Sequence, residues 1–176
     1  MSLSRDAILL DNIKEALALY QRSLVWGTTA ALSGLLIAIR LFWGPTPDPI
    51  PVLSGTLSAP LAWIIALVLY LVFGALAFTA IRRYQVALAA LNPSAEILEA
   101  IRLYPSLATL PGRFFRWGSV LVPSLAAVAS WIIELLREHS TSSTRAIGFV
   151  LIGLPVTILL LLPYLGILAS LREVRE

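Results

Sequence analysis

The sequence predicts an all-α integral membrane protein, organised as a bundle of four transmembrane helices. Of its 176 residues, 59% are hydrophobic and only 13% are charged, a composition typical of membrane proteins. Residues 60–81 contain no charged side chain and no Asn, Gln or His. As a helix they would reach about 33 Å, close to the hydrocarbon thickness of a bilayer. The predicted spans are residues 23–43, 60–81, 114–135 and 146–170.

The segments between the spans are too short for a second domain. The longest, residues 82–113, has 32 residues, below the roughly 40 that a self-supporting soluble domain needs. We therefore expect residues 1–176 to form a single membrane domain. Cysteine is absent, which excludes disulfides and thiolate metal sites. Polar residues at positions 11–15 interrupt any signal-peptide core, so we expect the first span to be an uncleaved anchor.

Residues 4–22 are predicted to form an amphipathic helix before the first span. Its apolar residues recur at heptad spacing in one narrow seam, which consists of Leu10, Ile13, Leu17 and Tyr20. Acidic and basic side chains balance in this segment, whereas helices that lie on a membrane surface are usually richer in Lys and Arg. The pattern favours a stalk that continues the span over a helix that lies flat on the bilayer.

The first span carries small residues on one face. Ala30, Gly34 and Ala38 are four positions apart, so they would let another helix approach closely. We interpret this face as a contact for helix packing or assembly. Trp26 and Trp43 bracket the span and are predicted to anchor it at the two headgroup regions.

The connection between the first two spans, residues 44–59, is rich in proline. Proline fixes φ and has no amide hydrogen, so the segment is predicted to be an extended or turning loop and a plain connector.

The second span is expected to continue as a helix to Leu91. Apolar residues again recur along this extension, at Tyr84, Leu88 and Leu91. If the two stalk helices pair as antiparallel neighbours, we expect three pairs of residues at the same height along the helix axes: Tyr20 with Tyr84, Leu17 with Leu88, and Ile13 with Leu91. A short helix is expected over residues 93–103, opened by Asn92-Pro93 and ended before Pro105.

Residues 113–117 combine basic and aromatic side chains. In a soluble protein such a run would suggest stacking on nucleic-acid bases, but directly before an apolar span it is typical of a headgroup belt. The predicted belt consists of Arg113, Phe114, Phe115, Arg116 and Trp117. No nucleic-acid partner is therefore predicted.

The fourth span contains prolines at positions 155 and 163. Each removes a backbone hydrogen bond, so a kink or break is expected in this helix.

The distribution of basic residues predicts the orientation. With both termini in the cytosol, ten of the 13 basic residues face inward: Arg5, Lys14, Arg22, Arg82, Arg83, Arg102, Arg113, Arg116, Arg172 and Arg175. This bias predicts an N-in, C-in topology, with the lipid bilayer of an inner or plasma membrane of bacterial type as the surroundings.

The sequence contains no motif for catalysis, and we do not expect an enzyme. The carboxylates and the single His lie at span ends or in loops, where they neither relay protons nor ligate a haem within the membrane. Glu134, Glu138 and His139 have ligand chemistry, but Arg137 lies among them, and a solvated helix end explains them better than a metal site. No cofactor is predicted, although a bound lipid or pigment in an apolar groove would leave no signature.

Two classes of function follow from these observations. The first is a non-catalytic multi-pass subunit that assembles into a homo-oligomer, which could form a pore, or joins a partner membrane complex, with the cytosolic helices as a docking platform. The alternative is a carrier or channel for an uncharged or lipidic molecule that uses the kinked fourth span.

Overall fold

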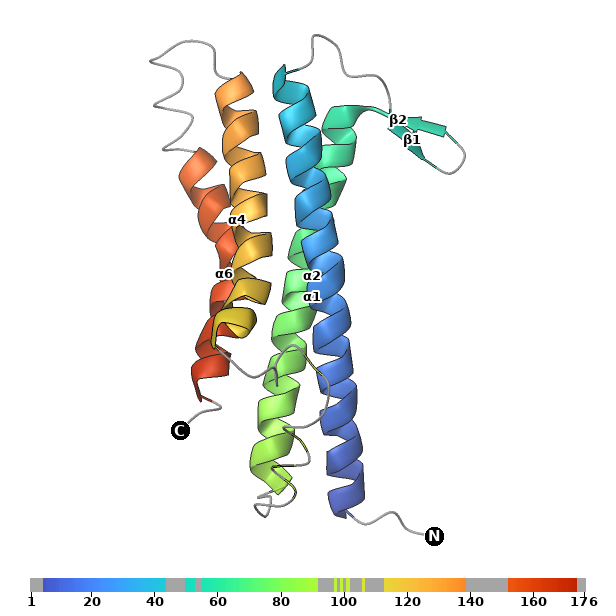
Figure 1. The fold of residues 1–176 in the computed structure, drawn as a ribbon, viewed down its shortest axis with the longest axis vertical. Helices are drawn as coiled ribbons and strands as arrows, with labels where there is room; N and C mark the ends of the chain where they lie inside the picture. The colour runs from blue at the N-terminus through green and yellow to red at the C-terminus, as the bar shows by residue number, and fades with distance from the viewer. Residues whose placement is uncertain are drawn as a thin grey trace.

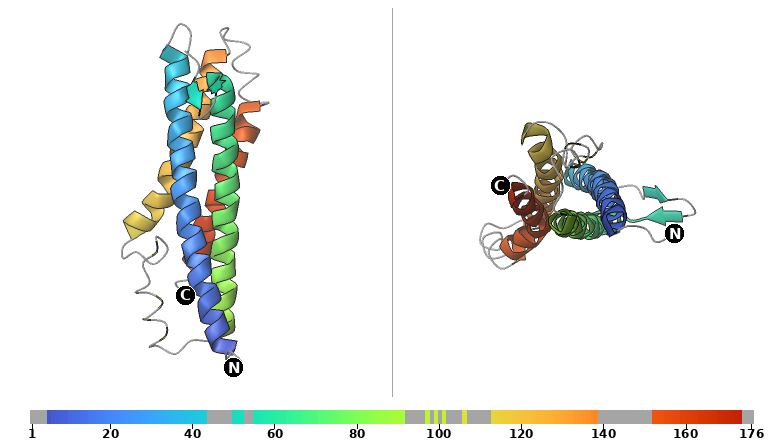
Figure 2. Two further views of the ribbon diagram at one scale, coloured as in Figure 1. Left: turned by 90° about the vertical axis from the view of Figure 1, so that its right-hand side faces the viewer. Right: turned by 90° about the horizontal axis from the view of Figure 1, so that it is seen from below.

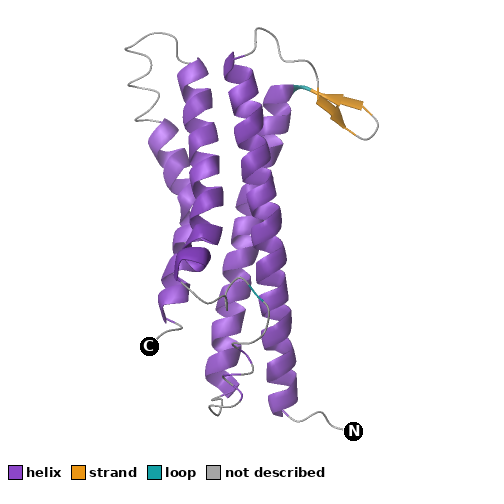
Figure 3. Cartoon of the chain, in the orientation of Figure 1, coloured by secondary structure: helices purple, strands orange, loops and turns teal. Residues whose placement is uncertain are grey.

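This computed structural model describes residues 5–43, 50–52, 55–91, 97, 99, 101, 106, 113–138 and 152–173. The described residues form four helices and one two-stranded hairpin (Figures 1 and 3). The elements are α1 (Arg5–Trp43), β1 (Ile50–Val52), β2 (Gly55–Leu57), α2 (Ala59–Leu91), α4 (Arg113–Glu138) and α6 (Leu154–Glu173). The expected all-helical fold is therefore present, apart from the small hairpin.

The helices form one elongated bundle. α1 packs most extensively against α2 and also contacts α4, while α6 packs against α2 and α4. Seen along the bundle, the helices follow the order α1, α2, α6 and α4 around the centre (Figure 2). At the end where the chain begins, α1 and α2 run together beyond α4 and α6 (Figure 1).

α1 is a single unbroken helix of 39 residues. Its sequence contains no proline, and Asp6 in the first turn and Arg40 in the last complement the helix dipole. Gly44 and Pro45 follow its last residue and punctuate its end. The amphipathic segment and the first predicted span thus belong to the same helix.

Three of the helices are long and apolar enough to cross a membrane: Arg5–Trp43, Ala59–Leu91 and the Trp117–Arg137 part of α4. The apolar part of α6, Leu154–Ser170, is shorter, and would reach about 25 Å as a helix. The predicted fourth span began at residue 146, which lies outside the described residues.

The prolines of α6 are accommodated without ending the helix. Pro155 lies in its first turn, where no helical hydrogen bond is lost. A π-helical turn at residues 152–153 precedes it. Pro163 lies inside the helix, and in the turn before it the Leu160 carbonyl accepts a hydrogen bond from the Tyr70 hydroxyl, at 2.9 Å. A side chain of α2 thereby binds the backbone of α6 in the turn before the proline.

The described part of the proline-rich connection is a small hairpin, which the sequence analysis did not predict. β1 and β2 pair antiparallel, with Ile50 opposite Leu57 and Val52 opposite Gly55. Two residues separate the strands, and a two-residue hairpin closes on a hydrogen-bonded pair. Pro51 therefore stands opposite Thr56 in a non-hydrogen-bonded pair, where its missing amide hydrogen costs no ladder bond.

Glycines allow an aromatic side chain to enter the centre of the bundle. Tyr164 of α6 is almost fully buried, and its ring stacks on Tyr70 of α2, with centroids 4.8 Å apart and planes 7° apart. A methyl group added at Gly74 would lie 2.7 Å from this ring, and one added at Gly27 would lie 2.7 Å from its hydroxyl oxygen. The absence of a side chain at both glycines therefore sets the spacing of α1, α2 and α6.

Away from the centre, towards the start of α2 and the end of α4, a pair of tryptophans holds the bundle together. Trp63 of α2 stacks on Trp131 of α4, with centroids 5.9 Å apart. The Trp131 indole donates a hydrogen bond to the Gly153 carbonyl, at 3.3 Å, and the Thr157 hydroxyl donates to the same oxygen, at 2.7 Å. These bonds occupy a carbonyl of the π-helical turn.

Replacement of Gly74 by Ala should destabilise the protein by about 1–3 kcal/mol, because the new methyl group meets a packed ring. Gly118→Ala is the matched control, since nothing lies within 4 Å of a methyl group there. A helical Gly→Ala change without a clash should stabilise by about 0.4–1 kcal/mol. Thermal unfolding of both variants in detergent checks the opposite signs, and an equal or higher melting temperature for Gly74→Ala would contradict the tight contact.

Candidate functional site

The α1–α2 pair that extends beyond the bundle has an apolar seam. Ile13, Leu17, Tyr20 and Tyr84 are buried in the core of the protein, and Leu10, Leu88 and Leu91 are partly buried and pack against that core. We refer to residues 5–22 of α1 and 82–91 of α2 as the stalk. The structure therefore brings all seven residues of the sequence-derived seam into one continuous apolar core.

The register of the stalk differs from the expected one. A methyl group on Gly34 would touch Ala66, and one on Gly27 would touch Phe73, each at 3.4 Å. A step of seven residues along α1, from Gly27 to Gly34, therefore moves the facing position back by seven residues along α2, from Phe73 to Ala66. Extended by ten residues, this register places Leu17 level with Arg83, whereas the sequence-based expectation was Leu88. That expectation was wrong by about one helical turn, as was the pairing of Ile13 with Leu91, because Ile13 is level with Ala87.

Part of the connection between α2 and α4 covers the stalk. Ile101 is buried in the same core, and Ile97 packs against it. The short helix expected over residues 93–103 falls mostly outside the described residues, but Ile97, Glu99 and Ile101 are helical. Ile97 and Ile101 thus belong to, or pack against, the same apolar core as the stalk seam.

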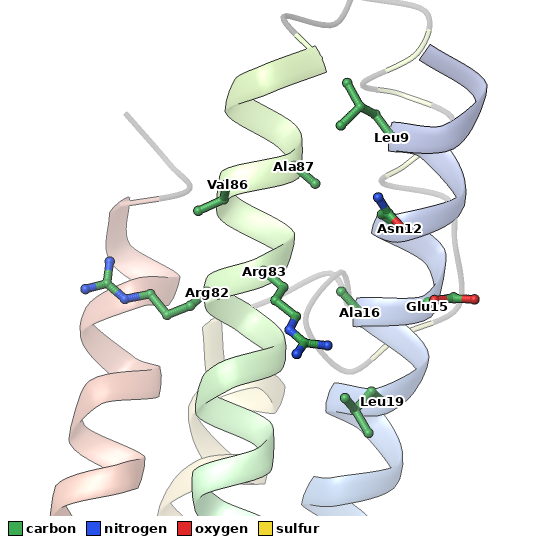
Figure 4. A pocket seen from close by; sticks show the side chains of 9 residues that line it. All are labelled: Leu9, Asn12, Glu15, Ala16, Leu19, Arg82, Arg83, Val86 and Ala87. Atoms are coloured by element: carbon green, nitrogen blue, oxygen red, sulfur yellow. The ribbon is translucent and has the colours of Figure 1, made fainter. Parts of the chain in front are cut away.

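Another flank of the stalk is open and forms a groove between α1 and α2, with a volume of about 650 Å³. Its lining is mostly apolar, with charged and amide groups at intervals (Figure 4). The residues that line this α1–α2 groove are Leu9, Asn12, Glu15, Ala16, Leu19, Arg82, Arg83, Val86 and Ala87. Val86 is 70% exposed, which is unusual for an apolar side chain in a packed helix pair.

The charges in the groove are not neutralised by one another. Arg83 points into the space between the helices, whereas Glu15 points away from α2 (Figure 4). Arg82 extends away from α1, and its guanidinium lies over the Phe78 ring, 5.8 Å from the centroid. Among the described residues, Arg137 and Glu134 of α4 form an ion pair, and none links Glu15, Arg82 or Arg83. The groove therefore presents both signs of charge beside an apolar floor.

The small-residue face of α1 lies inside the bundle. Ala30, Gly34 and Ala38 are all buried. A methyl group on Gly34 would lie 3.4 Å from Ala66 of α2 and 3.9 Å from the Ser130 hydroxyl of α4. This face is therefore occupied by two helices of the same chain and is not exposed for assembly.

The residues predicted to lie at the headgroups, which are Trp26, Trp43 and the belt of residues 113–117, have different surroundings. Trp26 is exposed and stacks on Phe73 of α2, with centroids 6.4 Å apart, so it also contributes to the α1–α2 contact. Trp43 is exposed at the end of α1. Trp117 is partly buried in α4. Arg113, Phe114, Phe115 and Arg116 form the first turn of α4, and their side chains lie outside the description.

The described residues contain no group of three or more acidic, His or Cys side chains that could hold a metal ion. Glu134 is buried and pairs with Arg137. The side chain of Glu138 and all of His139 lie outside the description.

Sequence reasoning missed the groove and the central tyrosine. Leu9, Ala16 and Leu19 recur on one side of the apolar seam, and this spacing was a signal that α1 has a second apolar flank. Arg82 and Arg83 were interpreted only as basic residues that set the orientation. Tyr164 gave no signal, because α6 is apolar on all sides and has no periodicity to reveal which residue faces inward.

No known protein family matches this chain, nor does any curated protein or solved structure.

The register of the stalk can be tested by disulfide formation, because the native chain has no cysteine. Ile13→Cys with Ala87→Cys should oxidise efficiently, since both positions are buried and level. Leu17→Cys with Leu88→Cys is the control, about 7.5 Å apart along the helix axis. The yields of intramolecular disulfide should favour the first pair, and a higher yield for the control pair would restore the sequence-based register.

Proposed function

We propose that the protein is a non-catalytic multi-pass membrane subunit that assembles with copies of itself or with a partner membrane complex. The observation that carries this proposal is the stalk. α1 and α2 have 39 and 33 residues, and would reach about 58 and 50 Å, well beyond the roughly 30 Å of hydrocarbon. The part of this helix pair that protrudes is not needed to cross the bilayer, and it offers a surface to other proteins.

The packing of the interior supports the same proposal. Tyr164 fills the centre against Gly27 and Gly74, and a methyl group on Gly166 would lie 2.8 Å from the Phe78 ring. Contacts this close fill the space between α1, α2 and α6 at these positions. A pore, if one is formed, would lie between copies of the chain.

In the proposed arrangement all four helices cross the membrane, with both termini and the stalk in the cytosol. α6 is the shortest, and a short apolar helix can span by local thinning of the bilayer or by association with its neighbours. The bias of basic residues supports this orientation.

A carrier for an uncharged or lipidic molecule is the second candidate. α6 combines a π-helical turn with an internal proline, two features at which helices kink. The Tyr70–Tyr164 stack and the hydrogen bond to Leu160 hold this helix against α2 and weigh against such movement.

The orientation predicts opposite labelling of two single cysteines. Ser54→Cys should react with an impermeant maleimide on intact cells, and Ser94→Cys should react only after the cells are permeabilised. Labelling of Ser94→Cys on intact cells would reverse the proposed topology.

The function is tested by mass and by flux. The protein, purified in detergent from cells that express it at native level, should have a mass of at least twice 19.1 kDa or retain a partner chain. Liposomes that contain it should release glycerol and flip a fluorescent phospholipid no faster than empty liposomes. A lone monomer contradicts the subunit proposal. Flux from a monomer favours the carrier, and flux from the oligomer alone indicates a pore between copies.

A further inference from the structure

We infer that the α1–α2 groove is covered by the stalk of a second copy of this chain, with Glu15 of each copy paired to Arg83 of the other. The inference deepens the proposed function and rests on it, because it names the surface and the partner of the assembly. The two stalks would be related by a two-fold axis along the membrane normal, so that the same contact occurs twice.

The charges of the groove are the first reason. The groove carries a carboxylate and a guanidinium that do not pair within one chain. Two copies of the groove can therefore face each other with opposite charges in contact. Glu15 points away from α2 and Arg83 lies in the groove, and no ion pair forms between them within one chain (Figure 4). In a two-fold contact Glu15 and Arg83 of each copy meet their opposites on the other copy, while Arg82 stays over the Phe78 ring.

The levels of these residues are the second reason. The register of α1 and α2 places Glu15 level with residue 85, which is two residues, or about 3 Å, from Arg83 along the axis. Two copies in one membrane have the same orientation and the same depth. Side chains that are level within one stalk are therefore also level between two stalks, which a soluble dimer would not require.

The apolar lining is the third reason. Val86, Leu9 and Leu19 form much of the groove, and Val86 is largely exposed. In the proposed topology Val86 and Leu9 lie beyond Arg82 and Arg83, outside the hydrocarbon, where apolar surface faces water. Covering it with the same surface of a second copy removes that contact with water from both.

An anionic lipid headgroup is the other occupant that two adjacent arginines could attract. A headgroup at Arg82 and Arg83 has its acyl chains on the membrane side, so it would leave Val86 and Leu9 uncovered. A second stalk covers the whole groove, and for this reason we favour it.

Charge exchange tests the inference on the full chain in lipid nanodiscs and in detergent. Glu15→Arg alone and Arg83→Glu alone each place like charges at both contacts, and should weaken self-association by about tenfold or more. Co-expression of the two single variants restores opposite charges at both contacts, and so does the double variant. Both should recover the wild-type mass. Lys14→Glu is the control, because Lys14 is exposed on the same helix but does not line the groove.

The possible outcomes separate the alternatives. Recovery by the double variant without recovery by co-expression would mean an ion pair within one chain, and would overturn the inference. If Arg83→Glu weakens self-association and neither co-expression nor the double variant restores it, the groove binds a lipid, and the inference is also overturned. If all variants keep the wild-type oligomer, the assembly uses another face, so the inference fails while the proposed function stands.

A second measurement does not depend on charged variants. Val86→Cys in membrane vesicles should form a disulfide-linked dimer on mild oxidation, and Lys14→Cys should not. Absence of the Val86→Cys dimer, or equal yields at both positions, would overturn the inference.

Discussion

The arrangement of the bundle depends on the insertion of Tyr164 between three helices. In lipid there is little hydrophobic drive for one helix to join another, so close packing and hydrogen bonds between helices must supply the affinity. Tyr164 lies against glycines of α1 and α2 and stacks on Tyr70, while the Tyr70 hydroxyl binds the backbone of α6. The glycines allow the ring to enter, and the ring in turn fixes how far apart the helices stand.

The number and kind of helices could be predicted from the sequence because the signals are local. The uncharged run from Pro60 and the proline that follows Gly44 mark α2 and the end of α1 without reference to any other helix. The apolar periodicity of the stalk likewise identifies Ile13 and Leu17 as buried. Such properties depend on one helix at a time.

The relation between helices could not be predicted in the same way. The register of α1 and α2 is set by Gly34 against Ala66 and Gly27 against Phe73, deep within the bundle, whereas the sequence-based estimate started from the ends of the spans. The hairpin was missed because proline usually argues against a strand, and only pairing reveals that Pro51 occupies a position that needs no amide hydrogen. The groove arises where two flanks meet, so neither helix alone contains it.

The continuity of α1 has a mechanical consequence. A helix of 39 residues without proline has an unbroken backbone, so a sideways force on its N-terminal end is transmitted along the helix. The contact of Gly27 with Tyr164 lies about 33 Å from Arg5 and about 24 Å from Trp43, and acts as a pivot between two arms of a lever. A displacement of the stalk in one direction would move the end that carries the hairpin in the opposite direction, by about three-quarters of that distance. In the proposed topology the helix would couple the two sides of the bilayer as a rigid rod, without any change in its own conformation.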